Sequence, residues 1–131
     1  MIDYFNQIFD KVCREVWNEF GNDIEIKGEY VSTPSKFPTI TIEERMNIPS
    51  NLDNGVIKYA DVQYRVQVFT NSTDKRSKAR KLFGKVNDIL YDCNIICKTY
   101  TTIPEIYNSS IYEIQATFEA TIDSNGTIYR R

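Results

Sequence analysis

The chain has 131 residues, of which 41% are hydrophobic and 26% are charged, a balance typical of a soluble globular protein with a single core. Its formal net charge is −2, which excludes a strong overall attraction to nucleic acid or to an anionic membrane surface. The lack of histidine removes the commonest general acid–base group and the commonest metal ligand. We therefore expect one domain over residues 1–131.

The first predicted element is an amphipathic helix from Phe5 to Phe20. Asp3 is placed to cap its first turn, and Gly21 suits the position after its last turn. A stripe this aromatic needs a covering surface, and we expect it to pack on a sheet. Its apolar residues recur at steps of three and four, namely Phe5, Ile8, Phe9, Val12, Cys13, Val16, Trp17 and Phe20.

Two strands and a long loop are predicted next. Apolar and polar residues alternate over 24–30 and again over 39–43, as in half-buried strands. The proline-bounded segment 34–38 separates them as a turn. Residues 46–58 contain the breakers Pro49, Asn54 and Gly55 and are predicted to be a loop. Because long loops in compact domains are often functional, Asn54 is a candidate contact residue.

A third strand is predicted from Tyr59 to Phe69. One face carries Val62, Tyr64, Val66 and Val68, which we expect to be buried. The opposite face is polar and is expected to meet solvent. Arg65 and Gln67 lie on it and are candidate contacts with other subunits.

A second amphipathic helix follows, with an apolar stripe from Ala79 to Cys93 and an N-cap offered by residues 71–74. Its first turns are basic, which is unfavourable toward the helix dipole by a few tenths of a kcal/mol per charge. We therefore expect these cations to face another subunit or solvent. Contact with nucleic-acid phosphates is the alternative, disfavoured by the acidic balance of the chain. The candidate contacts here are Lys75, Arg76, Lys78 and Arg80.

The C-terminal part is predicted to be β-structure. Residues 95–102 form one strand, and the longest alternation in the chain, over 112–122, predicts a long strand with one wet face. A turn at 123–126 then allows 127–131 to fold back as a short strand. The long strand and the tail are suited to pair across subunits. The terminal candidate contacts are Arg130 and Arg131.

The predicted order is α-β-β-β-α-β-β, which indicates a two-layer α+β domain. An antiparallel sheet of about four to six strands would carry both helices on one face. The sequence shows no catalytic dyad, phosphate-binding loop or zinc-ligand set, and its odd number of cysteines favours no disulfide framework. No apolar run approaches the roughly 20 residues of a membrane-spanning helix. We expect a protein that is no enzyme and has no cofactor, metal or membrane partner.

Two stretches carry a family resemblance. One is Val66–Asn71 with the lysine-rich helix through Ile89–Leu90, and the other is Tyr112–Ala120 with the closing run 125–131. Together with the element order, they resemble the tail terminator (tail completion) proteins of long-tailed bacteriophages and related phage-tail-like particles. The resemblance extends over nearly the whole chain but transfers no binding residue, so the candidate contacts above rest on physical reasoning.

The resemblance implies a hexameric ring that caps the tail tube, ends its polymerisation and joins it to the head-side connector. The implied partners are further copies of the chain, the tail tube protein, the connector and, in contractile particles, a sheath protein. No specific nucleic acid is implied. The implied location is the neck end of the virion tail, assembled in the cytoplasm of the bacterial host. Two alternatives stay open: another head–tail connector or adaptor, and a small nucleic-acid-binding α+β domain.

Overall fold

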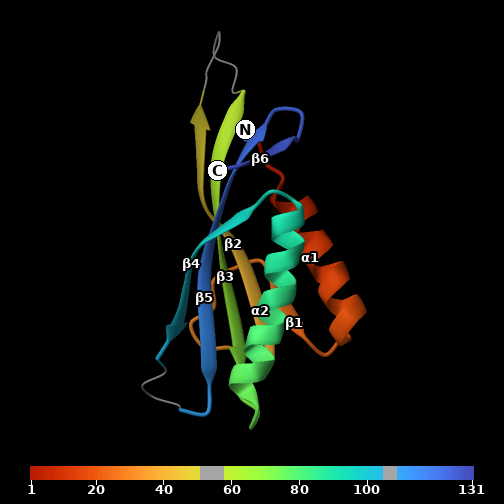
Figure 1. The fold of residues 1–131 in the computed structure, drawn as a ribbon, viewed down its shortest axis with the longest axis vertical. Helices are drawn as coiled ribbons and strands as arrows, with labels where there is room; N and C mark the ends of the chain where they lie inside the picture. The colour runs from red at the N-terminus through yellow and green to blue at the C-terminus, as the bar shows by residue number, and fades with distance from the viewer. Residues whose placement is uncertain (51–57, 105–108) are drawn as a thin grey trace.

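The structure, a computed structural model, describes residues 1–50, 58–104 and 109–131 and is an α+β fold (Figure 1). The order of its elements confirms the predicted order, with the terminal hairpin added. They are α1 (Phe5–Phe20), β1 (Glu25–Lys27), β2 (Thr39–Ser50), β3 (Tyr59–Thr70), α2 (Lys75–Asp92), β4 (Ile96–Ile103), β5 (Tyr112–Asp123) and β6 (Ile128–Arg130).

The strands form one six-stranded sheet in the order β1-β2-β3-β5-β4, with β6 also paired to β5. All neighbours are antiparallel except β1 and β2, which run parallel with Glu25 opposite Thr39. A parallel pair needs a crossover, and residues 28–38 supply it. β5 is paired with β3 on one side and with β4 and β6 on the other. The prediction that the long strand pairs across subunits is therefore wrong, because both of its sides are occupied.

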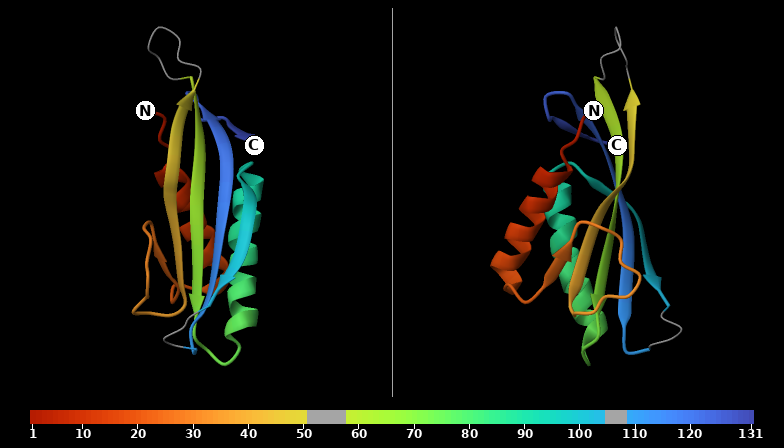
Figure 2. Two further views of the ribbon diagram at one scale, coloured as in Figure 1. Left: turned by 90° about the vertical axis from the view of Figure 1, so that its left-hand side faces the viewer. Right: turned by 180° about the vertical axis from the view of Figure 1, so that it is seen from behind.

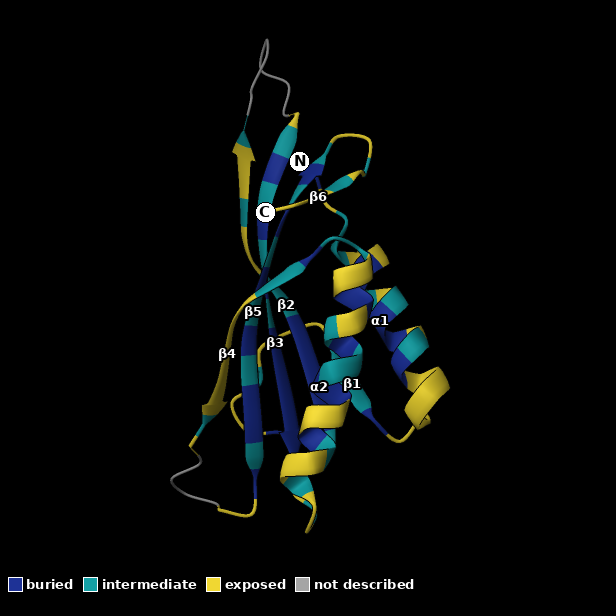
Figure 3. Cartoon of the chain, in the orientation of Figure 1, coloured by how far each residue is buried: buried dark blue, intermediate teal, exposed yellow. Residues whose placement is uncertain are grey.

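Both helices lie on the same face of the sheet, as predicted (Figure 2). The apolar stripe of α1 buries Ile8, Val12, Cys13 and Val16, and that of α2 buries six residues from Ala79 to Leu90. Exposed residues gather on the outward sides of the helices (Figure 3). The side chains that the sheet contributes to this core include Ile40, Ile42, Tyr64, Val66, Val68, Ile114, Phe118 and Ile122.

The ends of α1 follow local sequence signals. The Asp3 carboxylate accepts a hydrogen bond from the backbone N–H of Phe5 at 3.2 Å, so it satisfies one of the free donors of the first turn. Gly21 ends the helix with a φ of +95°, a conformation that side chains other than glycine's disfavour. Trp17 is 37% exposed, yet its indole N–H donates to the carbonyl of Ile24 at 2.8 Å.

β2 is longer than predicted. Residues 46–50 belong to the strand, with Met46 opposite Gln63 and Ser50 opposite Tyr59, so the loop prediction is wrong there. Pro49 is tolerated because β2 is an edge strand of the described sheet at this height, a position where proline is found. Asn54 lies outside the described residues.

Candidate interaction surfaces

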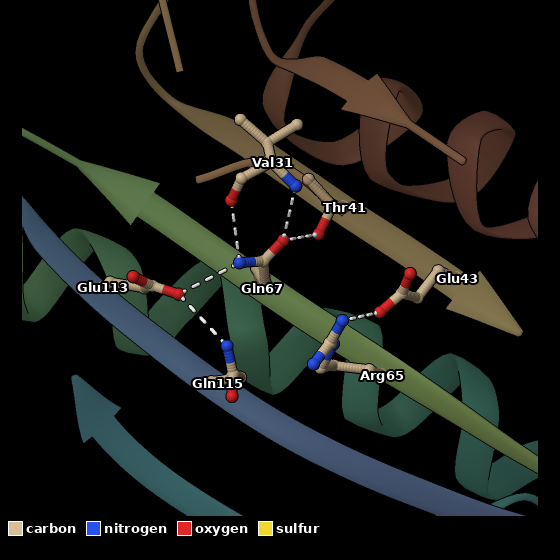
Figure 4. Close-up of polar contacts among 7 residues, drawn as sticks. All are labelled: Val31, Thr41, Glu43, Arg65, Gln67, Glu113 and Gln115. Atoms are coloured by element: carbon tan, nitrogen blue, oxygen red, sulfur yellow. Dashed lines mark hydrogen bonds and ion pairs between the residues drawn. The ribbon is translucent and has the colours of Figure 1, made fainter. Parts of the chain in front are cut away.

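The sheet face opposite the helices, here called the outer face, is covered at one end by residues 28–38, here called the strap. Gln67 ties the strap down (Figure 4). Its Oε1 accepts from the Val31 N–H at 3.1 Å and from the Thr41 hydroxyl at 2.7 Å. Its Nε2 donates to the Val31 carbonyl at 3.0 Å and to Glu113 Oε2 at 3.1 Å. Both donors and both acceptor positions of the amide are thus used.

This network shows that the expectation of a solvent-exposed polar face on β3 is wrong at Gln67. Gln67 is 1% exposed and Glu113 is 4% exposed, so Gln67 presents no surface to another subunit in this chain. Arg65 is half-buried beside them, paired with Glu43 and with its guanidinium 4.5 Å from the centre of the Tyr30 ring. Period-two alternation predicted which face these residues occupy. It carried no information on a strap that folds over that face from elsewhere in the chain.

The basic first turns of α2 are the most charged candidate surface. Arg76 and Arg80 are exposed, and no acidic partner is found for either within the described part of the chain. Lys75 donates to the carbonyl of Ser109 at 2.8 Å. The side chain of Asp74 makes no capping bond to the helix, contrary to the predicted N-cap. Its pKa is held below the ordinary value, first by the Ser72 hydroxyl and the backbone.

A hollow of about 370 Å³ separates these turns from the end of α1. Its wall combines apolar and charged groups, so a partner seated there would meet both. Lys78 is half-buried in this wall. The lining includes Phe20, Asp23, Ile24, Pro38, Asp74, Lys78, Lys81 and Leu82.

The C-terminal arginines are held by their own chain. Arg130 Nε donates to Asn94 Oδ1 at 2.9 Å, and its guanidinium lies 4.5 Å from the centre of the Tyr91 ring. Arg131 is 3.4 Å from a carboxylate oxygen of Glu119. These contacts place both side chains on the body of the protein, where a frayed end was one reading of the sequence.

The structure adds a surface that sequence reasoning missed, on the part of the β2–β3 hairpin that extends past the helices at the top of Figure 1. Met46 is 44% exposed and Ile48 is 47% exposed. Both lie on the outer face, since they sit opposite Gln63 and Asp61 of β3. Their spacing of two is a strand signal, obscured by the loop-like composition around Pro49.

Those predicted contacts that lie among the described residues do not converge on one site. The basic turns of α2 lie at one end of the long axis and the β2–β3 hairpin at the other (Figure 1). Arg65 and Gln67 lie on the outer face between them, and the C-terminal arginines lie toward the hairpin end. Such a distribution suits several separate contacts better than a single ligand site.

The described residues offer neither a metal site nor a membrane-spanning helix. No group of three or more histidine, cysteine, aspartate or glutamate residues is placed to hold a metal ion in that part of the chain. Neither described helix combines the length and the apolar character that crossing a membrane requires.

Of the comparisons with known proteins, the one with solved structures gave a match. No family model matches the sequence, and no curated protein matches it significantly. Among solved structures, a chain of the virion of a native gene transfer agent (GTA) particle has a similar fold, with a TM-score of 0.62. The similarity covers 92% of this chain and 92% of that chain at 11% sequence identity. At this identity, the likeness shows a shared fold.

Proposed function

We propose that this chain is a structural protein of a phage-like particle. The observation that carries the proposal is the fold shared with a virion chain over 92% of both lengths. Nearly complete coverage matters because fold and length agree together, with no large part of either chain unmatched. Fold alone does not determine function, so the sequence features and the surfaces supply the further argument.

Within that class, the function supported best is the tail terminator's. A ring of these chains caps the tail tube, ends its polymerisation and joins it to the head-side connector. The resemblance of the strands and of the lysine-rich helix to that family supports this role. The distribution of surfaces supports it too, because a capping ring needs contacts with its neighbours, with the tube below and with the connector above. We assign no catalysis to the chain.

The basic turns of α2 are the best candidate for the partner contact. Arg76 and Arg80 have no acidic partner in the described chain, so no ion pair of that part must break when they contact an acidic protein surface. Charges of this kind also accelerate association. This contact is expected to weaken with salt, since exposed charges are screened beyond about 8 Å at physiological ionic strength.

The test is an assembly reaction with the tail tube protein of the same particle. Purified chain is added to polymerising tube protein, and tube lengths are measured by negative-stain electron microscopy. Substoichiometric protein is expected to shorten the tubes and to leave a ring at one end of each. Tubes of unchanged length with bare ends would overturn the proposal.

Two variants sharpen this test. The double variant Arg76→Glu and Arg80→Glu is expected to lose capping at least tenfold while its melting temperature stays within a few degrees, because both side chains are exposed. Gln7→Glu, on the solvent side of α1, is the matched control and is expected to cap normally. Equal capping by all three proteins would remove the basic turns from the contact.

The same material separates the two alternatives. A connector or adaptor would bind portal protein and leave tube growth unchanged. A nucleic-acid-binding domain would retain duplex or single-stranded DNA at low salt and lose it steeply as salt rises.

A further inference from the structure

The sheet has two open edges, one on each side. β1 covers only Thr39–Thr41 of β2, so no described strand pairs with the outer side of β2 from Glu43 to Ser50. At the opposite side, β4 is paired with β5 and with no other strand of the described residues. Open edges present unpaired N–H and C=O groups that template pairing with another strand. Charge, proline and irregular register limit such pairing, and these edges carry Pro49, Lys98 and one register irregularity each. Beside these features they carry exposed Met46, Ile48, Thr99 and Thr101.

We propose that copies of this chain join edge to edge, with the outer side of β2 in one copy pairing with β4 of the next. This proposal rests on the proposed ring function and names the contact that builds the ring. The joint connects two different surfaces, and such head-to-tail contacts are the kind that generate closed rings.

Strand direction favours this pairing. β2, β3, β5 and β4 are each antiparallel to the next, so β4 runs opposite to β2. When a second copy is placed beside the first in the same orientation, its β2 meets β4 in an antiparallel pair. The alternating direction of these four strands then continues from one copy to the next.

Length and charge agree with it. The open part of β2, residues 43–50, and β4, residues 96–103, are equal in length. The first carries Glu43, Glu44 and Arg45, and the second carries Lys98 as its only charge. The two segments therefore have net charges of opposite sign, which favours their approach without placing the charges directly opposite one another, whereas β2 with β2 or β4 with β4 would join like net charges.

The heights of the two edges supply a further constraint. The register of β2 with β3, and of β3 with β5, places the open part of β2 at the same height as Thr117–Asp123 of β5. The register of β4 with β5 places β4 at the height of Glu113–Glu119. Pairing along this whole length, in which Pro49 donates no hydrogen bond, thus offsets successive copies by about four residues, or about 13 Å. The repeat is four strands wide, about 19 Å. These lengths correspond to a strand tilt of about 35°, within the roughly 35–45° at which sheets close into barrels.

The offset also fixes the register. Met46 comes opposite Thr101 and Ile48 comes opposite Thr99 of the next copy. All four side chains lie on the outer face, as their partners inside each copy show. The same offset keeps β1 beyond the end of β4, and β6 beyond the end of β2, so neither short strand blocks the joint. Cross-strand contact then covers the two exposed apolar residues.

The test is directed disulfide formation in a chain whose native cysteines are replaced by serine or alanine. Ile48→Cys and Thr99→Cys are combined, and the protein is assembled with tube protein and oxidised. Within one copy these positions are separated by three strand spacings, about 14 Å or more, too far for a disulfide. Every cross-link therefore joins two copies. A non-reducing gel is expected to show a ladder that ends in a closed ring species.

Two controls define the background. Gln7→Cys with Thr99→Cys measures random collision, and Ile48→Cys with Thr101→Cys measures a register that is wrong by two residues. Both are expected to cross-link at least fivefold less than the matched pair. A ring seen by microscopy whose matched pair cross-links no better than these controls overturns the edge joint and leaves the capping function standing. If no ring forms, either with tube protein or without it, both the edge joint and the capping function are overturned.

A charge placed on the edge gives an independent readout. Ile48→Lys, at a side chain 47% exposed, is expected to keep the melting temperature of the monomer and to abolish ring formation. Gln7→Lys is the matched control and is expected to form rings. Rings formed by Ile48→Lys at the wild-type concentration would contradict the proposal.

Discussion

Truncation of Gln67 to alanine should detach the strap from the outer face. The amide makes four hydrogen bonds: two with the backbone of Val31, one with the Thr41 hydroxyl and one with the carboxylate of Glu113. Neutral bonds contribute about 0.5–1.5 kcal/mol each, and a bond to a charged group about 1.5–3 kcal/mol. Water reaching the half-buried Val31 offsets part of the loss. We expect Gln67→Ala to lower the free energy of unfolding by about 3–5 kcal/mol.

The matched control lies on the same strand and the same face. Gln63 is half-buried and makes one side-chain bond, to the carboxylate of Glu119 at 3.2 Å. Gln63→Ala should therefore cost less than the about 1.5–3 kcal/mol of a buried bond to a charged group, because water can replace the lost donor at this half-buried position. Urea unfolding followed by the fluorescence of Trp17, the single tryptophan, measures both losses. Hydrogen exchange at the Val31 amide reports the strap directly and should lose protection only in Gln67→Ala. Losses for the two variants within about 0.5 kcal/mol of each other, or unchanged Val31 protection, would refute the network as the anchor of the strap.

Three further predictions concern the body of the protein. Gly84→Ala should stabilise the protein by about 0.5–1 kcal/mol, because a Cβ there meets no atom within 4 Å and alanine favours helix. Gly126→Ala should destabilise the protein by about 1–3 kcal/mol, because the φ of Gly126 is +87° and a Cβ would lie 2.9 Å from the Tyr4 ring. Urea unfolding checks the opposite signs, and equal signs would contradict this account. Phe118→Ala, at a fully buried ring, should cost about 3–5 kcal/mol in the same assay. Burial, with a smaller contribution from the charge of a neighbouring aspartate, raises the pKa of the Cys13 thiol from 9.0 to about 11. The folded state therefore favours the protonated thiol, so stability should fall as pH rises from about 9 toward 11, and Cys13→Ala should flatten that part of the melting-temperature profile.

The sequence by itself determined the order of the elements, most of the secondary structure and the sides of most elements; the strand predicted over 24–30 is shorter in the structure, Glu25–Lys27. Both helical stripes and the alternation over 59–69 and 112–122 appear in the structure as predicted, because burial of a continuous apolar face enforces its period. Those faces determined the two-layer α+β arrangement in turn. Residues 46–50 were wrongly predicted to be a loop, because Pro49 was taken to interrupt a strand. Proline is tolerated in an edge strand, and whether a strand lies at the edge depends on its neighbours in the sheet.

Only the tertiary structure decided which of these surfaces are available to partners. Gln67 reads as an exposed strand residue, yet the strap, whose contacting Val31 is 36 residues away in sequence, makes it a buried anchor. The C-terminal arginines read as a loose end, yet Asn94 and Glu119 hold them. The long strand that seemed suited to pairing between copies lies inside the sheet. Among the described strands, the open edges include β4 and the part of β2 that β1 does not cover. Strand order and strap position depend on contacts between residues distant in sequence, which local periodicity does not encode.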